Sequence, residues 1–386
     1  MSMVDRTERK WYPLSRFLAE YKELNTDNKY RPVAVGRYGI RSRESIYSKE
    51  LAKDYSKNKL IYKGTLTVGM GSVKMDIGIL SDNEVYSVSP AYHTYRISGI
   101  DFDYLRYCLQ CRNMDMFTRY MKRGCRQGKS IDLGRWITYE IPVYPTQAQT
   151  EIVERLDRVQ RIIDARQQEL AAFDDLIQAR FIEMFGDPVY NEKSWSTQPL
   201  DDVCITIVDC PHSTPSYTFD DTGYMCIRTS IVKKNRILWD EIEYIPKEEY
   251  EQRIQRKKPE KGDVIYTREG AILGIAAVID KDCNVALGQR LMLLSTDKAY
   301  CTPEFLSVAM NFDSFLASAL KGMIGSASPH INVGDIKAFR MILPPVENQE
   351  QFSAFVSQVN KSKVAVQKAL DEAQLLFDSL MQKYFG

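Results

Sequence analysis

Two stretches of the chain place an apolar residue at every third or fourth position for about forty residues. The first runs from Thr146 to Phe185, preceded by Pro145 and followed by Gly186-Asp187-Pro188, and the second lies within 341–386. Alternating steps of four and three predict long helices with coiled-coil seams, and proline and glycine are typical of helix ends. The predicted seam residues are Ile152, Leu156, Val159, Ile163, Leu170, Phe173 and Ile177 in the first stretch, and Phe352, Val356, Val359, Val366, Leu370, Phe377 and Leu380 in the second.

Neither helix would be stable with such a stripe exposed, so we expect the two to pair with each other. An antiparallel pair of forty-residue helices would hold the segments that flank it up to ~60 Å apart, at 1.5 Å per residue. Arg166, Arg180 and Lys363 interrupt the stripes. We expect these three side chains to extend from the seam to water, and the alternative is that they mark contacts with partner proteins.

The segment 131–186 recurs, without a gap, as 331–386. At this offset Ile131, Gly134, Pro145 and Gln149 meet identical residues. Two amphipathic helices can match by chance, but the first three of these residues precede the helix, where periodicity creates no matches. The repeat therefore predicts two similar units related by a pseudo-two-fold axis.

Residues 1–140, before the first long helix, mix short β-rich runs with shorter helical stretches, which is typical of an α+β domain. The repeat predicts a second such domain before the second long helix. The predicted order is a first α+β domain, a central long helix, a second α+β domain and a C-terminal long helix, with the boundaries 1–140, 141–190, 191–340 and 341–386.

Composition and charge place limits on the class of protein. A chain of 386 residues that is 44% hydrophobic can bury more than one core. Residues 1–140 hold 25 Lys and Arg against 16 Asp and Glu, whereas 191–341 hold 18 against 21. The charge of the first domain is therefore compatible with a polyanionic partner. If the second domain binds DNA, it must do so with local basic patches, for which 227–236 and 253–261 are candidates. A charge run is more often only a solvated surface.

The sequence contains no apolar run that suggests a membrane span or a signal peptide, so we expect a cytoplasmic protein. Its eight cysteines follow no framework spacing, which favours reduced thiols.

Motifs for catalysis are weak throughout. "GCRQGKS" at 124–130 has three residues between its glycines, whereas a phosphate-binding loop needs four, so contact with a DNA backbone is the better interpretation. Cys108 and Cys111 form a C-x-x-C without a second pair, which favours two buried thiols over a metal site. His93, His212 and His330 are isolated, and "DCPH" at 209–212 is interpreted as a turn. We expect no metal site and no catalytic site.

Two similar domains held at a fixed distance are suited to a periodic linear ligand. On duplex DNA two such domains must be spaced by about one helical turn, ~34 Å, or a multiple of it. A scaffold that displays two protein-binding domains satisfies the same geometry, so the helices alone leave both functions open.

Several segments resemble the specificity subunits of type I restriction-modification systems, and the likeness covers nearly the whole chain. "IPVYPTQAQTEIVERL" from Ile141 and "ILPPVENQEQF" from Ile342 are similar to the family's helix starts, and "FIEMFGDP" and "LMQKYFG" to its helix ends. "GYMCIRTSIV" from Gly223, "KGDVIYTREGAILGIAAVI" from Lys261 and "GQRLMLL" from Gly288 are similar to its second recognition domain. The first domain keeps "LIYKGTLTVGMGSV" but lacks a counterpart of "GQRL".

The resemblance implies a non-catalytic DNA-binding subunit that directs adenine N6 methylation or restriction to a bipartite, asymmetric site. It implies two modification subunits, two restriction subunits and double-stranded DNA as partners. S-adenosylmethionine, ATP and Mg would be bound by those partner subunits, and no cofactor by this chain. Candidate DNA-binding residues are Arg41, Arg43, Lys63, Thr67, Met70 and Ser72 in the first domain, and Ser213, Thr214, Ser216, Arg228, Thr229, Arg268 and Glu269 in the second.

Three alternatives accompany this hypothesis. The chain could be the recognition subunit of a related methyltransferase-nuclease fusion system, or a coiled-coil scaffold that binds no DNA. A stand-alone enzyme is disfavoured by the missing motifs.

Overall fold

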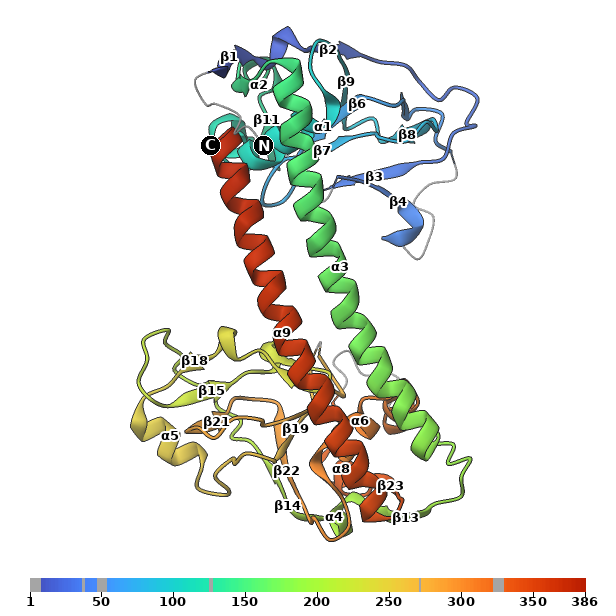
Figure 1. Cartoon of the computed structure of the whole chain (residues 1–386), viewed down its shortest axis with the longest axis vertical. Helices are drawn as coiled ribbons and strands as arrows, with labels where there is room; N and C mark the ends of the chain where they lie inside the picture. Colours follow the sequence, from blue (N-terminus) through green and yellow to red (C-terminus); the bar gives the residue numbers. More distant parts are fainter. Residues whose placement is uncertain (1–7, 37–38, 47–53, 125–127, 271, 322–329) are drawn as a thin grey trace. The chain divides into compact units, whose positions relative to one another are not determined.

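The computed structural model of the chain describes residues 8–36, 39–46, 54–124, 128–270, 272–321 and 330–386 (Figure 1). Contacts divide the chain into two compact units, of which unit 1 comprises Met1–Gln167 with Lys368–Gly386 and unit 2 comprises Gln168–Gln367. Each unit thus combines a mixed α/β body with one part of each long helix. The predicted boundaries 1–140, 141–190, 191–340 and 341–386 remain predictions.

Both long helices form. Helix α3 spans Thr146–Phe185, the range that the sequence predicts, and α9 spans Val346–Phe385. In unit 1 the beginning of α3 packs against the end of α9, and in unit 2 the end of α3 packs against the beginning of α9. The helices therefore run antiparallel, which confirms the predicted fold class.

The remaining elements of the first half of the chain are β1 (Lys10–Pro13), β2 (Leu18–Tyr21), β3 (Val33–Gly36), β4 (Gly39–Ser42), β5 (Lys59–Ile61), β6 (Thr65–Gly69), β7 (Asp76–Ile79), β8 (Tyr86–Val88), β9 (His93–Ile97), α1 (Phe102–Tyr120), β10 (Met121–Gly124), β11 (Gly128–Ile131), α2 (Leu133–Trp136) and β12 (Glu140–Val143).

Those of the second half are β13 (Ser196–Pro199), α4 (Leu200–Val203), β14 (Cys204–Asp209), β15 (Met225–Ile227), β16 (Val232–Lys233), β17 (Arg236–Ile237), β18 (Glu243–Tyr244), α5 (Lys247–Arg253), β19 (Val264–Thr267), β20 (Ala276–Val278), β21 (Val285–Leu287), β22 (Leu291–Thr296), α6 (Pro303–Met310), α7 (Asp313–Ala319), α8 (Val333–Lys337) and β23 (Arg340–Leu343).

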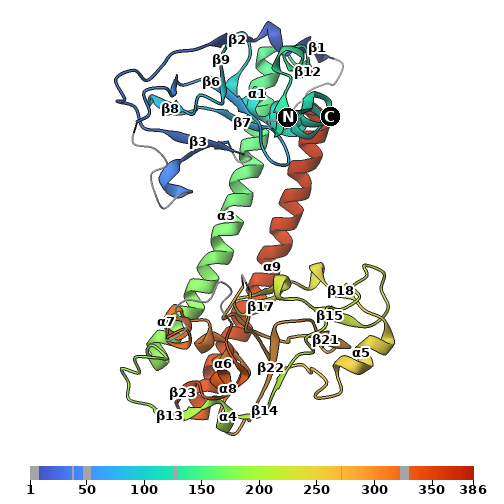
Figure 2. The ribbon, with the colours of Figure 1, turned by 180° about the vertical axis from the view of Figure 1, so that it is seen from behind.

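The predicted repeat is present in the sheets. Unit 1 contains a four-stranded sheet in the order β2-β9-β6-β7, and unit 2 contains one in the corresponding order β14-β22-β19-β20. In each unit a further antiparallel pair, β1 with β12 and β13 with β23, leads into a long helix. The α5 side of unit 2 adds the three-stranded sheet β18-β15-β21 (Figure 2).

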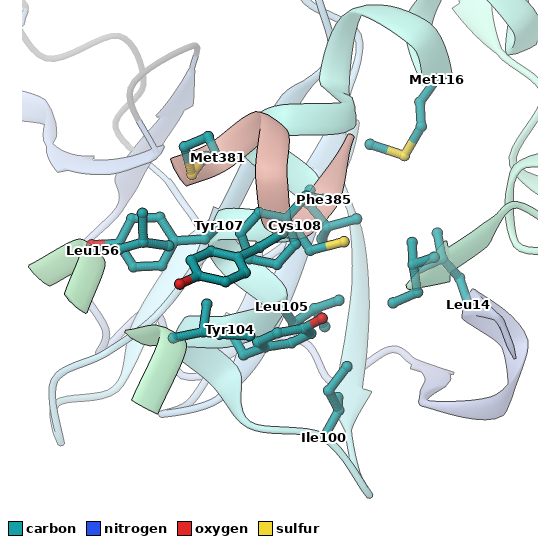
Figure 3. Packing of buried hydrophobic residues seen from close by; sticks show 14 of the residues in the cluster. Leu14, Ile100, Tyr104, Leu105, Tyr107, Cys108, Met116, Leu156, Met381 and Phe385 are labelled. Atoms are coloured by element: carbon teal, nitrogen blue, oxygen red, sulfur yellow. The ribbon is translucent and has the colours of Figure 1, made fainter. Parts of the chain in front are cut away.

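The main core of unit 1 lies where α1 meets the two long helices (Figure 3). Tyr104 and Tyr107 of α1 are almost completely buried and pack with Leu156 of α3 and with Met381 and Phe385 of α9. Burial of each such side chain stabilises the fold by roughly 1.5–3 kcal/mol, so the helix seam and the body of the unit share one core.

The predicted seam residues lie mainly in these two cores. Those of unit 1 that are buried or partly buried in its main cluster are Ile152, Leu156, Val159, Ile163, Leu370, Phe377 and Leu380, and those of unit 2 are Phe173, Ile177, Phe352, Val356 and Val359. Leu170 is half-buried and Val366 is buried, but neither belongs to either cluster. Among the interrupting residues, Lys363 is largely covered and pairs with Asp174, and the guanidinium of Arg180 lies 5.9 Å from the Phe355 ring centroid.

Two buried glutamines hold the start of each long helix. The Gln149 side chain donates to the Tyr144 carbonyl (2.8 Å) and accepts from the N–H of Asp101, which caps α1 (3.0 Å). Gln349 donates to the Pro344 carbonyl (2.9 Å) and accepts from the N–H of Thr302, which caps α6 (3.0 Å). Each amide thus fixes a long helix to the adjacent helix of its unit, which explains why the sequence repeat includes this residue.

A second pair of buried amides attaches a helix to the sheet. Asn113 of α1 accepts from the Met75 N–H (2.9 Å) and donates to the Met75 carbonyl (3.0 Å). Asn311, after α6, makes the same two bonds with Ala276, at 2.9 and 2.8 Å. Sequence reasoning missed this pair because the two residues do not obey the 200-residue offset.

The residues of the two sheets can be matched through one turn. "Lys63-Gly64" and "Lys261-Gly262" precede β6 and β19, and both glycines have a left-handed φ, +76° and +96°. The Gly64 N–H donates a hydrogen bond to the carbonyl of Leu80, just after β7, and the Gly262 N–H donates one to the carbonyl of Ile279, just after β20, both at 2.8 Å. Counting from these glycines makes Met70 the equivalent of Arg268.

The strand pairing extends this match to a second loop. Leu66 pairs with Tyr95, and its equivalent Val264 pairs with Leu294. Counting back from these partners makes Ser89-Pro90-Ala91 the equivalent of Gly288-Gln289-Arg290.

Candidate nucleic-acid interface

The candidate DNA-binding residues of unit 1 do not form one cluster. Arg41 lies on β4 and Arg43 just after it, with the Arg43 guanidinium 5.4 Å from the Tyr55 ring centroid. Lys63 precedes β6 and bonds Asn83 (3.1 Å), whereas the exposed Ser72 follows that strand. Lys63 and Ser72 therefore lie at opposite ends of β6.

Two candidate residues of unit 1, Thr67 and Met70, expose little of their side chains to solvent. The Thr67 side chain is fully buried in β6, and Met70 is half-buried against the core of unit 1. Because Thr67 lies in a middle strand whose two faces are covered, its side chain points into the fold, and its contact with DNA stays a prediction without support from the structure. The "GCRQGKS" prediction depends on 125–127, which lie outside the described residues.

In unit 2 three loops converge beside the start of β22. They are 209–216, which begins at the last residue of β14, 268–270, which follows β19, and 288–290, which precedes β22. The Arg268 N–H donates to the Arg290 carbonyl (3.1 Å), and the Cys210 N–H donates to the Leu291 carbonyl (3.1 Å). The Gln289 amide donates to the His212 carbonyl. We refer to these three loops as the unit 2 loop cluster.

The structure brings several of the predicted residues into or beside this cluster. Ser213, Thr214 and Ser216 are exposed on its first loop, where the Ser213 carbonyl accepts from Arg253 (2.8 Å). Glu269 lies on the second loop. Arg228 and Thr229 follow β15, whose Ile227 carbonyl accepts from the Gly288 N–H (2.8 Å), so they border the cluster.

Paired charges lie beneath this surface. Arg268 is 8% exposed and donates to both carboxylate oxygens of Asp209, at 3.0 and 3.1 Å. The exposed His212 ring approaches the same carboxylate at 3.1 Å. Arg268 thus forms a buried, bidentate ion pair that ties two loops together, and its contact with DNA stays a prediction.

Two further arginines are also engaged. Arg228 pairs with the buried Glu243 (3.0 Å), and Arg253 is enclosed by Glu249, Ser213 and the Leu287 carbonyl. Of the basic segment 253–261, Lys257 pairs with Glu260 and Asp263. The predicted patch therefore contributes structural ion pairs as well as surface charge.

The candidates chosen from the sequence do not include Gln289 and Arg290, which the structure places in the unit 2 loop cluster. Both belong to the quoted "GQRL" segment, but only the folded chain places them against loops that lie about 20 and 80 residues earlier. Arg290 is half-exposed, and its Nε lies 3.7 Å from the Glu269 carboxylate. A glycine-containing segment directly before a strand was the available signal.

The cysteines of unit 2 are held as neutral thiols. Burial raises the pKa of Cys210, and it raises the pKa of Cys204 and of Cys226 to about 12. In unit 1, Cys108 is buried but Cys111 is only half-buried, so the expectation of two buried thiols holds for one of them. Within the described residues, no group of three or more His, Cys, Asp or Glu side chains is placed to hold a metal ion.

No helix in the described part of the chain has an apolar stretch long enough to cross a bilayer.

Comparisons with known proteins agree on a family. The family model described as "Type I restriction modification DNA specificity domain" matches residues 18–172 and again 192–373. A curated relative, the type I restriction enzyme MjaVIII specificity subunit of Methanocaldococcus jannaschii, is 20% identical over an alignment of 251 residues, and the match covers 60% of this chain. The match spans 59% of the length of that relative.

Two solved structures share the fold. The S subunit of a type I restriction-modification system from M. genitalium matches with a TM-score of 0.57 and 12% identity, covering 100% of this chain and 98% of that one. A chain from a structure on complex assembly and conformational transition of the type I R-M system matches with a TM-score of 0.52 and 18% identity, covering 100% and 99%.

Proposed function

Because the chain belongs to the family of type I restriction-modification DNA specificity domains, we propose that it recognises a bipartite, asymmetric DNA site through its two units. The family model matches the chain twice, and each match contains one of the two equivalent four-stranded sheets. Two recognition domains in one chain are suited to two half-sites on one duplex.

The difference between the two units supports an asymmetric site. The equivalent positions Met70 and Arg268 hold an apolar residue and a buried cation, and Ser89-Pro90-Ala91 corresponds to Gly288-Gln289-Arg290. Base edges are discriminated by the donors, acceptors and apolar groups that a protein presents. Units with such different loops are expected to recognise different base sequences.

We also propose that the long helices bind two copies of a modification subunit, because each helix exposes an apolar residue at the same position of the repeat. Leu176 and Leu376 occupy equivalent positions of α3 and α9, and both remain exposed, by 47% and 51%. Leu176 belongs to unit 2 and Leu376 to unit 1. Identical exposed apolar residues at equivalent positions are suited to identical partners, one for each unit.

Catalysis in this proposal belongs to the partner subunits. The modification subunits would use S-adenosylmethionine to methylate adenine N6, and two restriction subunits would use ATP and Mg. Because methylation requires the adenine to leave the base stack, the duplex must also be held in a distorted form.

The alternative function, a scaffold without DNA affinity, makes an opposite prediction for one experiment. The chain, assembled with its modification subunit, is incubated with a library of randomised duplexes, and bound duplexes are sequenced. The proposal predicts enrichment of one motif with two separated half-sites, with an affinity that falls steeply as salt concentration rises. Absence of any enriched motif, in a complex whose methyltransferase is active, would favour the scaffold.

A further inference from the structure

Arg290 has an unusual main-chain conformation for an arginine. Its φ of +68° lies in the left-handed region, which side chains with a Cβ rarely adopt. The Arg290 carbonyl accepts from the Arg268 N–H (3.1 Å), and the nearby Gly288 N–H donates to the Ile227 carbonyl (2.8 Å), so the loop is held in this form. Glycine would adopt this conformation without strain. An arginine in its place indicates that the side chain has a use.

The guanidinium of Arg290 is positioned but remains open to solvent. Its Nε lies 3.7 Å from Glu269 Oε1, and its side chain is 52% exposed. Gly270, with a φ of +93°, lies beside it, and a Cβ added there would be 3.3 Å from Arg290 Nη1. Glycine at 270 therefore leaves room for the guanidinium. Arg228 and Arg268, by contrast, are paired with carboxylates that are largely buried.

The adjacent carboxylate distinguishes a base from a phosphate as the partner of Arg290. A phosphate that approached the guanidinium would also approach the Glu269 carboxylate, and the two negative charges would repel each other. The edge of a base carries no net charge. Guanine presents two acceptors, N7 and O6, that an arginine binds with two parallel hydrogen bonds. The Glu269–Arg290 pair is thus better suited to guanine than to the DNA backbone.

We propose that Arg290 recognises a guanine in the half-site bound by unit 2, with Glu269 holding the guanidinium in place. This proposal rests on the proposed function, since it names the base class that one unit recognises. Unit 1 has Ala91 at the equivalent position, so the requirement for this guanine belongs to one half-site only.

Duplex selection with variants of the assembled complex tests the proposal. Arg290→Gly removes the guanidinium and suits the left-handed backbone, so the variant should fold at least as stably as the wild type. Arg290→Lys keeps the charge but cannot form the two parallel bonds. Lys298→Ala removes one exposed charge beyond the other end of β22 and serves as the matched control.

Both Arg290 variants should lose the preference for guanine at one position of one half-site, with the affinity for the wild-type site about 10- to 100-fold weaker. The other half-site should stay unchanged, and Lys298→Ala should select the wild-type motif. A complete motif with Arg290→Lys, or an equal loss of affinity for all duplexes with Arg290→Gly, would overturn the assignment. A wild-type complex that selects no motif would overturn the proposed function itself, and this proposal with it.

Discussion

Unit 1 and unit 2 share a framework but differ in the loops that it carries. Both units have a four-stranded sheet with the same strand order. Both also have a glutamine that holds the long helix and an asparagine that attaches a helix to the sheet. The turns after β6 and β19 hold Met70 in one unit and Arg268 in the other. Residues that make the fold are thus repeated, whereas residues beside the candidate interface have diverged.

The two units should differ most in the unfolding free energy that is lost when Met70 or Arg268 is replaced by alanine. Arg268→Ala leaves the largely buried Asp209 carboxylate without its bidentate partner, and we expect a loss of about 3 kcal/mol in the free energy of unfolding. Met70→Ala removes a half-buried apolar side chain and should cost about 1 kcal/mol. Urea denaturation of both variants measures the difference. Equal costs at the two positions would contradict the assignment of Arg268 as a structural residue.

Replacement of Asn113 and of Asn311 should cause losses of stability that differ less. Asn311→Ala removes bonds to Ala276, to the Ser307 carbonyl and to Asn235, whereas Asn113→Ala removes those to Met75. We expect losses of about 3 and about 2 kcal/mol, because each leaves buried main-chain groups unpaired. Hydrogen exchange of the Ala276 and Met75 amides checks the mechanism, since each should exchange faster only in its own variant.

The two glutamines should behave alike. Gln149→Leu leaves the Asp101 N–H and the Tyr144 carbonyl without partners, and Gln349→Leu leaves the Thr302 N–H and the Pro344 carbonyl in the same state and also removes a bond to the Tyr300 carbonyl (2.9 Å). Each should cost about 2 kcal/mol. The exposed neighbour Thr150→Ala is a control on the same helix and should change stability by less than about 0.5 kcal/mol. Clearly unequal losses would show that the two equivalent glutamines contribute differently to the free energy of unfolding.

Substitutions of Leu176 and Leu376, the equivalent exposed leucines of α3 and α9, test the proposed binding of two modification subunits. Leu176→Asp and Leu376→Asp each place a charge on one exposed apolar position, and each single variant should bind one modification subunit instead of two. The double variant should bind none. Mass measurement of the assembled complexes gives the stoichiometry, and retention of two subunits by both single variants would contradict this surface.

The smallest effect at neutral pH concerns the buried thiols of unit 2. Burial raises the pKa of Cys204 and of Cys226 to about 12, so the folded state keeps protons that the unfolded chain releases at lower pH. Their stabilising contribution is complete below the usual thiol pKa and is lost as the pH rises through 12. Cys226→Ala should therefore reduce the decrease in unfolding free energy between about pH 9 and pH 12. An unchanged pH dependence would contradict the raised pKa.

Sequence patterns predicted the long helices and the repeat because these depend on local periodicity and on residues at a fixed offset. The apolar periodicity, with the flanking proline and glycine, predicted a helix from near Thr146 to Phe185, and the structure has it over this range. The burial of Arg268 depends on Asp209, a residue far away in the sequence that no spacing rule connects to it. Base-contacting candidates chosen for their polarity therefore included side chains that the fold uses internally, and they did not include Arg290, which we propose contacts a guanine.

Sequencing of methylated adenines in DNA tests the central claim most directly. Cells that carry this chain and its modification partner are compared with cells that lack only this chain. Our account predicts one bipartite motif with unlike halves and one methylated adenine on each strand, present only with the chain. An unchanged methylation pattern, with the partner shown to be active, would contradict recognition of DNA by the two units.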